Sequence, residues 1–330
     1  MKRPIEISVV MATYNRCEML KNQINCLLNQ SFDGDRYELI IVNDGSTDDT
    51  EEHLTSLAKE DSRITYLLQQ NRGPAAARNL GVFHAQGNII AFTDDDCLAD
   101  SEWLENIYRV FQEKSILAIQ GKTVSDKRQI NPLTHQVVNE NGDTSMPTCN
   151  AAYRKLVFEQ AGGFDESFPF QNEDADLSWR VREMGKVVFS PEVLMVHPPR
   201  QDTFFKNAKK MKHYVSEFML FHKNPALYRK YRCANPWELI YWRVMVKAHA
   251  YHFLTRIKFI RQPWIMVQGI ALSLYWWGDL LSKLPIFWRA DREYQRYYAN
   301  KKVQIRIHTL ADNSQPKEKE MVSQNKAEVL

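Results

Sequence analysis

The stretch Ile89–Asp96, which reads IIAFTDDD, joins a short apolar run directly to three carboxylates. An apolar run of this length that ends at charge is typical of a strand buried on both faces of a sheet. Adjacent carboxylates repel one another unless water or a cation neutralises them, and their hard oxygen atoms favour Mg²⁺ or Mn²⁺. The stretch therefore predicts a divalent-metal site just beyond the end of this strand. In extended backbone, Asp94 and Asp96 would point one way and Asp95 the other.

Strand and helix signals alternate on either side of this stretch. Apolar strand runs are followed by segments with apolar residues at helical spacing, in the order Ile5–Met11, Cys17–Gln30, Glu38–Asn43, Leu54–Ala58, Ile64–Leu68 and Pro74–Ala85. The alternation predicts right-handed βαβ units, and hence an α/β fold with a Rossmann-like, mostly parallel sheet and flanking helices. Further along we expect helices from Ser101, near Tyr153–Ala161 and over Asn172–Met184, strands at Val187–Phe189 and Val193–Val196, and a loop over Lys127–Pro147.

Polar residues follow three of the predicted strands. Thr13 and Asn15 come after the first strand, Asp44 after the second, and the carboxylates of residues 94–96 after the fourth. Because ligands bind beyond the carboxyl ends of strands in open parallel sheets, we expect these side chains to share one site. For Asp44 alone, the ordinary tendency of Asp to end strands and begin turns is an equally good explanation. The joint pattern is what favours a site.

Several other kinds of site are disfavoured. No G-x-G-x-x-G follows the first strand and no G-x-x-x-x-G-K-[ST] occurs, so we expect no glycine cradle for phosphate. The five cysteines are widely spaced and contain no C-x-x-C pair, which argues against a disulfide framework or a zinc ribbon and favours a reducing compartment. Met1–Pro4 leads straight into the first strand, so we expect no secretory signal.

As a set, segments of residues 5–200 resemble the family 2 glycosyltransferases with the GT-A fold, in the family's order. The matching segments are Val9–Asn15, Ile41–Asp48, Asn71–Gly73, Ala77–Asn79, Phe92–Asp96, Gly162–Glu166, Glu173–Leu177 and His197–Pro198. Ala12 stands where the family usually has proline, which affects the shape of a loop more than its chemistry. The resemblance implies an enzyme whose donor is a nucleotide-diphosphate sugar.

The resemblance also implies roles for individual residues. The nucleotide-sugar-binding segments would contain Thr13, Asn15, Asp44, Arg72, Arg78, Asp94 and Asp95, with Asp44 accepting a hydrogen bond from the base. Asp96 and His197 would hold Mn²⁺ or Mg²⁺, and Asp94 would contact either the ribose or the metal.

For the chemistry, the resemblance implies Asp174 as catalytic base, with Glu173 beside it. One base and one metal suit a single in-line displacement that inverts the anomeric carbon. Ordinary explanations exist for these residues too. Carboxylates are favoured at helix starts, Arg72 and Arg78 could be surface cations, and His197 could simply end a strand. Two other functions stay open: a nucleotidyltransferase acting on sugar phosphates, and a non-catalytic nucleotide-sugar-binding protein. The first would normally show a glycine-rich basic loop after the first strand, and the intact carboxylates argue against the second.

Residues 200–310 differ in composition from what precedes them. Residues 1–199 carry 19 Lys and Arg against 30 Asp and Glu, whereas residues 200–310 carry 21 against 6 and hold six of the eight tryptophans. Trp together with basic side chains is typical of a membrane interface, and anionic lipid would attract such a surface. We therefore predict a glycosyltransferase domain over residues 1–200, a basic aromatic helical region over residues 201–310, and a polar disordered tail over residues 311–330.

Within the basic region, Trp264–Leu281 is 18 residues long with Asp279 as its one charge, at the short edge for a membrane span. We favour helices that lie on the membrane over a single short span, and a soluble helical subdomain is the remaining alternative. No nucleic-acid-binding motif is present, so we expect no nucleic acid partner. The predicted location is cytoplasmic, peripheral at the inner face of the membrane. There the enzyme would serve a glycan or lipid-linked acceptor in cell-surface polysaccharide or glycolipid synthesis.

Overall fold

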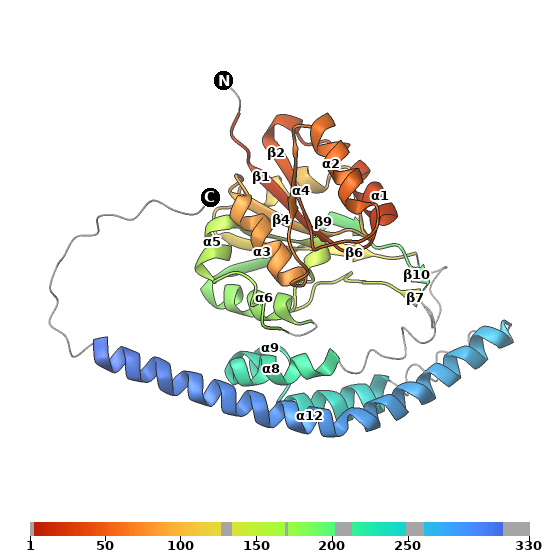
Figure 1. Cartoon of the computed structure of the whole chain (residues 1–330), viewed down its shortest axis with the longest axis vertical. Helices are drawn as coiled ribbons and strands as arrows, with labels where there is room; N and C mark the ends of the chain where they lie inside the picture. Colours follow the sequence, from red (N-terminus) through yellow and green to blue (C-terminus); the bar gives the residue numbers. More distant parts are fainter. Residues whose placement is uncertain (1–2, 127–133, 169–170, 202–212, 249–260, 313–330) are drawn as a thin grey trace.

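The computed structural model describes residues 3–126, 134–168, 171–201, 213–248 and 261–312, without the side chains of residues 248 and 302–312. An α/β domain holds the sheet between helices, and helices of the C-terminal region extend along one side of it (Figure 1). The order of strands in the main sheet is β3-β2-β1-β4-β8-β6-β9-β5. The expected fold class, an α/β domain with a mostly parallel sheet and a helical C-terminal region, is confirmed.

The first half of the sheet is parallel. β1 (Ile7–Thr13) pairs with β2 (Tyr37–Asn43) and β4 (Ile89–Asp94), and β3 (Ile64–Leu68) pairs with β2. The connecting helices are α1 (Cys17–Leu28), α2 (Thr50–Glu60) and α3 (Pro74–His84), with a short 3₁₀ turn η1 (Gly34–Arg36) before β2. Thr13 lies opposite Asn43, and Ala12 lies opposite Asp94. The three strands therefore end nearly level, and the residues after them come to one edge.

Successive residues of β1 face opposite sides of the sheet, as the strand geometry requires. Val9 and Met11 pack in a core with α1, α2 and α4 (Trp103–Val110). Val10 packs on the other side with α3, α5 (Lys155–Gln160) and α6 (Glu173–Met184). Because both faces are covered, these strands appear in the sequence as continuous apolar runs instead of alternating ones.

The second half of the sheet mixes strand directions. β8 (Ala151–Arg154) is antiparallel to both β4 and β6 (Ile116–Val124), β9 (Lys186–Val196) is parallel to β6, and β5 (Leu98–Ala99) is antiparallel to β9. A separate antiparallel pair is formed by β7 (Thr134–His135) and β10 (Arg200–Gln201), and a 3₁₀ turn η2 (Thr148–Asn150) precedes β8.

Three elements differ from expectation here. β6 was not expected, and Tyr153 lies in β8 instead of opening a helix, which begins at Lys155. The two strands expected near residues 187–196 are one strand, β9, whose register against β6 shifts between Ser190 and Leu194. Pro191 lies in that interval and interrupts the ladder because proline has no N–H to donate. Of the loop expected over Lys127–Pro147, residues 127–133 lie outside the described residues.

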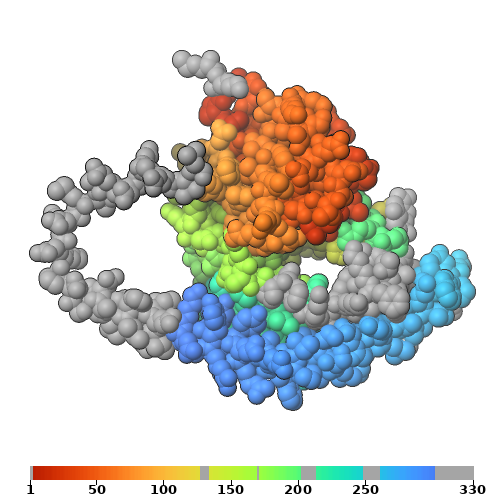
Figure 2. Space-filling model, viewed as in Figure 1, coloured from red at the N-terminus to blue at the C-terminus, as the bar shows by residue number. Residues whose placement is uncertain are grey.

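The described part of the C-terminal region is helical. It comprises α8 (Val215–Lys223), α9 (Pro225–Tyr231), α10 (Pro236–Glu238), a π-helical segment η4 (Leu239–Ala248) and α12 (Pro263–Asp312). α8 and α9 lie between the α/β domain and α12 (Figure 1), and α12 forms a long ridge along one side of the molecule (Figure 2). Phe218 of α8 packs against Phe287 of α12 with ring centroids 5.9 Å apart.

The segment Trp264–Leu281 lies within α12. None of the helices in the described ranges has an apolar stretch of the length that crossing a bilayer needs. Most of the tail expected to be disordered, residues 313–330, lies outside the described residues.

The close approach of α3 to β1 gives a test of this packing. A Cβ added at Gly81 would lie 2.5 Å from Val10 Cγ1 and 3.3 Å from Val42 Cγ2. Since valine is stiff at χ1, Gly81→Ala should lower the free energy of unfolding by about 1–3 kcal/mol in urea denaturation. Gly278→Ala on α12, where a Cβ would meet nothing within 4 Å, is the control and should cost no stability. Equal stability of the two variants would contradict the packing described.

Candidate active site

A cavity of about 350 Å³ lies at the edge where β1, β2 and β4 end. Its lining consists of Ala12, Thr13, Tyr14, Arg16, Asp44, Asn71, Gly73, Pro74, Arg78, Asp94 and Asp95. Five of these were predicted from the sequence to belong to the site: Thr13, Asp44, Arg78, Asp94 and Asp95. Loops after several strands contribute side chains, so the site is built by the level ends of parallel strands.

Asp44 organises the loop between β3 and α3. Its buried carboxylate accepts hydrogen bonds from the backbone N–H groups of Arg72 (2.8 Å) and Gly73 (2.9 Å), and from the side-chain amide of Gln69 (2.6 Å). Gly73 has a φ of 89°, a left-handed conformation that glycine adopts without steric cost. A carboxylate has about four acceptor positions, so the bond expected from a nucleobase would be additional to these three.

Asn15 is not part of the cavity lining. Its backbone N–H donates to Ser46 Oγ (2.9 Å), and its side-chain oxygen accepts from the N–H of Thr47 (2.7 Å). Its φ is 54°, which Asn tolerates better than most residues. Asn15 thus attaches the loop after β1 to the loop that begins with Asp44, and its contact with a nucleotide stays a prediction.

Arg78 connects the two sides of the site. It is only 6% exposed, and its guanidinium donates to Asp94 Oδ1 (2.7 Å) and to Glu173 Oε1 (3.2 Å). Asp94 ends β4 and Glu173 begins α6, so one cation links β4 to the helix that carries the candidate base. Among the described residues, Arg78 Nε is buried without a hydrogen-bond partner.

The three adjacent carboxylates do not alternate as expected. β4 ends at Asp94, and Asp95 and Asp96 lie in a turn, where the period of an extended strand no longer applies. Asp95 is buried and accepts hydrogen bonds from Thr13 Oγ1 (2.7 Å) and Arg16 Nη1 (2.8 Å). The same Arg16 nitrogen lies 3.1 Å from Asp96 Oδ2. Burial raises the pKa of Asp95 to about 6, although Arg16 acts in the opposite direction.

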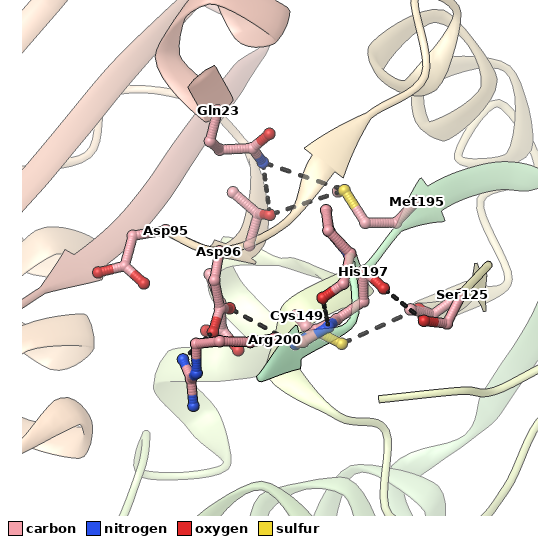
Figure 3. Close-up of polar contacts among 12 residues, drawn as sticks. Gln23, Asp95, Asp96, Ser125, Cys149, Met195, His197 and Arg200 are labelled. Atoms are coloured by element: carbon pink, nitrogen blue, oxygen red, sulfur yellow. Dashed lines mark hydrogen bonds and ion pairs between the residues drawn. The ribbon is translucent and has the colours of Figure 1, made fainter. Parts of the chain in front are cut away.

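Asp96 faces the end of β9. His197 Nε2 lies 3.6 Å from Asp96 Oδ1, and Arg200 Nη1 lies 3.0 Å from Asp96 Oδ2 (Figure 3). His197 is 1% exposed, and its Nδ1 is 3.2 Å from the carbonyl oxygen of Pro198. A proton on Nδ1 would leave Nε2 free to bind a metal. The possible ligand atoms of Asp96, Cys97 and His197 all lie within 4.8 Å of one another, which makes this group a candidate metal centre.

Asp94 and Asp96 line different cavities. Asp94 lines the large one, whereas Asp96 and Arg200 line a neighbouring cavity of about 210 Å³. The structure therefore pairs Asp96 with His197, and the part of Asp94 in metal binding stays a prediction.

Asp174 lies in the first turn of α6, directly after Asn172 and Glu173. Its Oδ1 accepts a hydrogen bond from the N–H of Ala175 (2.7 Å). Burial, and then repulsion from Glu173, raise the pKa of Asp174, while the Ala175 N–H and Arg78 act in the opposite direction. A partly buried carboxyl group with a raised pKa beside an arginine is a physical indication of a functional site.

Arg72 lies at the outer side of the site. Its guanidinium is exposed and donates to Glu166 Oε2 (2.7 Å), and Glu166 Oε1 also accepts from Asn79 Nδ2 (3.0 Å). Asn79 further bonds both the backbone N–H and the carbonyl of Phe164. The segment Gly162–Glu166 is therefore held against α3 and next to the large cavity.

Two arginines of the site were not selected from the sequence. Arg16 pairs with Asp95 and Asp96, and Arg200 pairs with Asp96 from 104 residues away. Three adjacent carboxylates do signal that cations must be near. Which arginines approach depends on the fold, because Arg200 reaches Asp96 only through the pairing of β9 with β5.

A protein-family model covers this edge of the sheet. The family model Glycosyl transferase family 2 matches residues 8–165, which include every residue lining the large cavity. The matched part, residues 8–165, belongs to glycosyltransferase family 2. The candidate base and His197 follow the matched part, in α6 and at the end of β9.

Curated relatives of this family 2 chain include other glycosyltransferases. An uncharacterized glycosyltransferase of Rickettsia felis is 36% identical over 155 residues, which are 47% of this chain and 23% of that protein. Glycosyltransferase AglE of Haloferax volcanii is 25% identical over 204 residues, which are 59% of this chain and 67% of AglE. The chain therefore spans less than a quarter of the length of the Rickettsia relative.

Solved structures of similar fold are glycosyltransferases as well. The mannosyltransferase PcManGT from Pyrobaculum calidifontis, in complex with GDP-Man and Mn²⁺, superposes with a TM-score of 0.54 at 19% identity, over 91% of this chain and 89% of that one. S. aureus TarS 1-349 in complex with UDP gives 0.52 at 16% identity, over 91% and 92%. At these sequence identities, the structural similarity shows that this chain has the same fold, and nothing more.

The two arginines expected to bind the nucleotide sugar should differ in their effect on stability. Arg78 is buried between Asp94 and Glu173, so Arg78→Met leaves two poorly solvated carboxylates unpaired and should cost about 3 kcal/mol or more in metal-free urea denaturation. Arg72 pairs with Glu166 in solvent, so Arg72→Met should cost no more than about 1 kcal/mol. If the two variants were equally stable, Arg78 would not have the central role assigned to it.

Proposed function

We propose that this family 2 chain transfers a sugar from a nucleotide-diphosphate sugar to an acceptor hydroxyl, with inversion at the anomeric carbon. Three groups carry the proposal: the cavity around Asp44 and Arg78, the Asp96–His197 pair, and the carboxylate of Asp174. Arg16 joins the cavity to the second group by pairing with Asp95 and Asp96, and Arg78 joins it to the helical turn of the third by pairing with Glu173. Sugar transfer needs a donor pocket, charge stabilisation for the leaving diphosphate and a proton acceptor, and each group suits one of these needs.

The cavity around Asp44 is the proposed site for the nucleotide. Its volume of about 350 Å³ falls in the usual range for small-molecule pockets. The guanidinium of Arg78 belongs to the cavity lining, and a cation there suits an anionic donor. Two solved structures of similar fold hold GDP-Man or UDP, which supports a nucleotide sugar as the donor. Thr13, Asn15, Arg72 and Asp95 belong to the segments proposed to surround it.

Asp96 and His197 are the proposed ligands of Mn²⁺ or Mg²⁺, with Asp94 as a contact for metal or ribose. The donor set fits such an ion because a carboxylate oxygen and a neutral imidazole nitrogen both suit Mn²⁺. The 3.6 Å between His197 Nε2 and Asp96 Oδ1 is a separation that one ion can bridge. A bound ion would stabilise the negative charge that develops on the diphosphate. The Mn²⁺ in the PcManGT complex supports this part of the proposal.

Asp174 is the proposed catalytic base. It would accept the proton of the acceptor hydroxyl as that oxygen bonds to the anomeric carbon. The bond from that carbon to the diphosphate breaks at the same time, and its electron pair leaves with the phosphate oxygen. A single displacement of this kind inverts the anomeric configuration. The raised pKa of Asp174 suits a base that works near neutral pH, and Glu173, bonded to Arg78, holds the same helical turn in place.

Single substitutions should separate donor binding from transfer. With Mn²⁺ and a panel of UDP- and GDP-sugars, the full chain should release nucleoside diphosphate. Asp96→Ala should lose Mn²⁺-dependent binding of UDP or GDP in calorimetry. Asp174→Asn should keep that binding and lose transfer by about 10²–10⁴-fold. Asp100→Asn, outside both cavities, should behave as wild type. Full transfer by Asp174→Asn would remove it as the base, and a wild-type chain that bound neither nucleotide would contradict the proposal.

The C-terminal helices are proposed to dock on an anionic membrane at its inner face, next to a glycan or lipid-linked acceptor used for a cell-surface polysaccharide or glycolipid. Four large side chains of these helices, Trp242, Trp264, Leu274 and Trp288, are each more than half exposed. The 21 basic against 6 acidic residues of segment 200–310 supply the matching charge. Exposed aromatic rings beside basic groups suit the headgroup layer of an anionic bilayer.

Vesicle binding tests the docking proposal. The full chain should cosediment with phosphatidylglycerol vesicles and much less with phosphatidylcholine vesicles, and added salt should weaken the binding because it screens surface charge. Replacing Trp242, Trp264 and Trp288 together by Ala should release the protein. Phe83→Ala removes an exposed aromatic ring from α3 and is the matched control. Equal binding to both kinds of vesicle, or no effect of the triple substitution, would contradict this surface.

A further inference from the structure

A fully buried carboxylate lies on α8, outside the matched family segment. Glu217 is 0% exposed. Its Oε1 accepts hydrogen bonds from Asn172 Nδ2 (3.0 Å) and Arg232 Nη2 (2.5 Å), and its Oε2 accepts from the hydroxyl of Tyr228 (2.9 Å). A buried charge is costly unless it is paired and hydrogen-bonded. Three donors satisfy this requirement, Asn172 before α6 and Tyr228 and Arg232 in α9 and at its C-terminal cap, so the side chain has one defined position.

Asn172 is the residue of the α/β domain that Glu217 contacts, and its conformation determines how α6 begins. Asn172 is 7% exposed and has a φ of 79°, a left-handed conformation that is unfavourable for most side chains. Its carbonyl oxygen accepts the N–H of Asp176 (3.0 Å), which closes the first helical turn. That turn contains Glu173 and Asp174. The conformation of Asn172 therefore determines the direction in which the side chain of Asp174 leaves the backbone.

α8 contacts the same segment at two further points. Ser216 Oγ accepts the backbone N–H of Gln171 (3.4 Å), so consecutive residues of α8 bind consecutive residues before α6. Lys223 Nζ, at the other end of α8, lies 2.9 Å from Asp176 Oδ2 and also pairs with Asp165. The helix is thus bonded to the chain on both sides of Asp174. These contacts restrict residues 171–176 more than the backbone hydrogen bonds of a helix N-terminus alone would.

We propose that Glu217 is a positioning residue for the reaction, because it holds Asn172 in the left-handed conformation that directs Asp174 toward the acceptor hydroxyl. The inference rests on the proposed function, in which Asp174 is the base. It makes the C-terminal helical region part of the catalytic apparatus as well as a docking element. A misplacement of about 1 Å can cost on the order of 10²-fold in rate, so the contact need not touch substrate to matter.

Asn172→Gly tests the inference in the full chain. Glycine accepts the backbone conformation but removes the side-chain bond to Glu217. With Mn²⁺ and the UDP- or GDP-sugar that the wild type uses, kcat for nucleoside diphosphate release should fall about 10- to 100-fold, with the donor KM within about twofold of wild type. Amide hydrogen exchange should quicken over residues 171–178 and stay unchanged in α8. Asn235→Ala, which removes the side-chain cap of α10, is the matched control and should keep wild-type kcat.

Glu217→Gln is the second variant, since it preserves shape but loses the charge that strengthens the three hydrogen bonds of Glu217. It should lower kcat by a smaller factor, again without a change in KM. If both variants kept wild-type kcat, or if KM rose while kcat stayed constant, the positioning role would be overturned. An active wild type with unaffected variants overturns this inference alone. A wild type that released nucleoside diphosphate from no donor would overturn the proposed function and this inference together.

Discussion

The guanidinium of Arg78 lies between two carboxylates that come from different parts of the domain. Asp94 ends a strand of the parallel half of the sheet, and Glu173 opens the helix that carries the candidate base. Removal of the guanidinium would leave both carboxylates without the counter-ion that they share. One side chain on α3 therefore links the cavity at the strand ends to the helical turn that contains Asp174.

Much of this arrangement could be predicted from the sequence, for physical reasons. Strands covered on both faces appear as apolar runs, and helices show apolar residues at helical spacing. The sequence alone therefore predicts the βαβ order. The residues after β1, β2 and β4 come together because these parallel strands end nearly level. Thr13, Asp44, Asp94 and Asp95 share a cavity for that reason, and Arg78 joins them from α3.

Side-chain directions were harder to predict. The turn after β4 rotates Asp95 toward Thr13 and Asp96 toward His197, and nothing in three consecutive aspartates indicates where the strand stops. Asn15 follows the rule for residues beyond a strand, yet its side chain is bonded to a neighbouring loop. Long-range partners such as Arg200 require the order of strands in the sheet, which local patterns do not contain.

The C-terminal region illustrates a related difficulty. Its basic and aromatic composition indicated a surface role, and composition cannot show that one of its few acids is buried against the α/β domain. Glu217 is one of only six acidic residues in segment 200–310, so its carboxylate is an unusual feature of a basic region. Its burial is visible only in the structure. α8 packs on α12 through Phe218 and bonds Asn172 through Glu217, so it would connect a proposed docking helix to the segment before the candidate base.

The central claim is that donor, metal and base meet at the edge where β1, β2 and β4 end. Diffraction at the manganese absorption edge, from crystals of the full chain grown with MnCl₂ and UDP or GDP, tests it most directly. We expect an anomalous peak bonded to Asp96 and His197, with the diphosphate beside it and the nucleoside in the cavity of Asp44 and Arg78. A manganese peak remote from Asp96 and His197, or a nucleotide bound away from that cavity, would contradict the account.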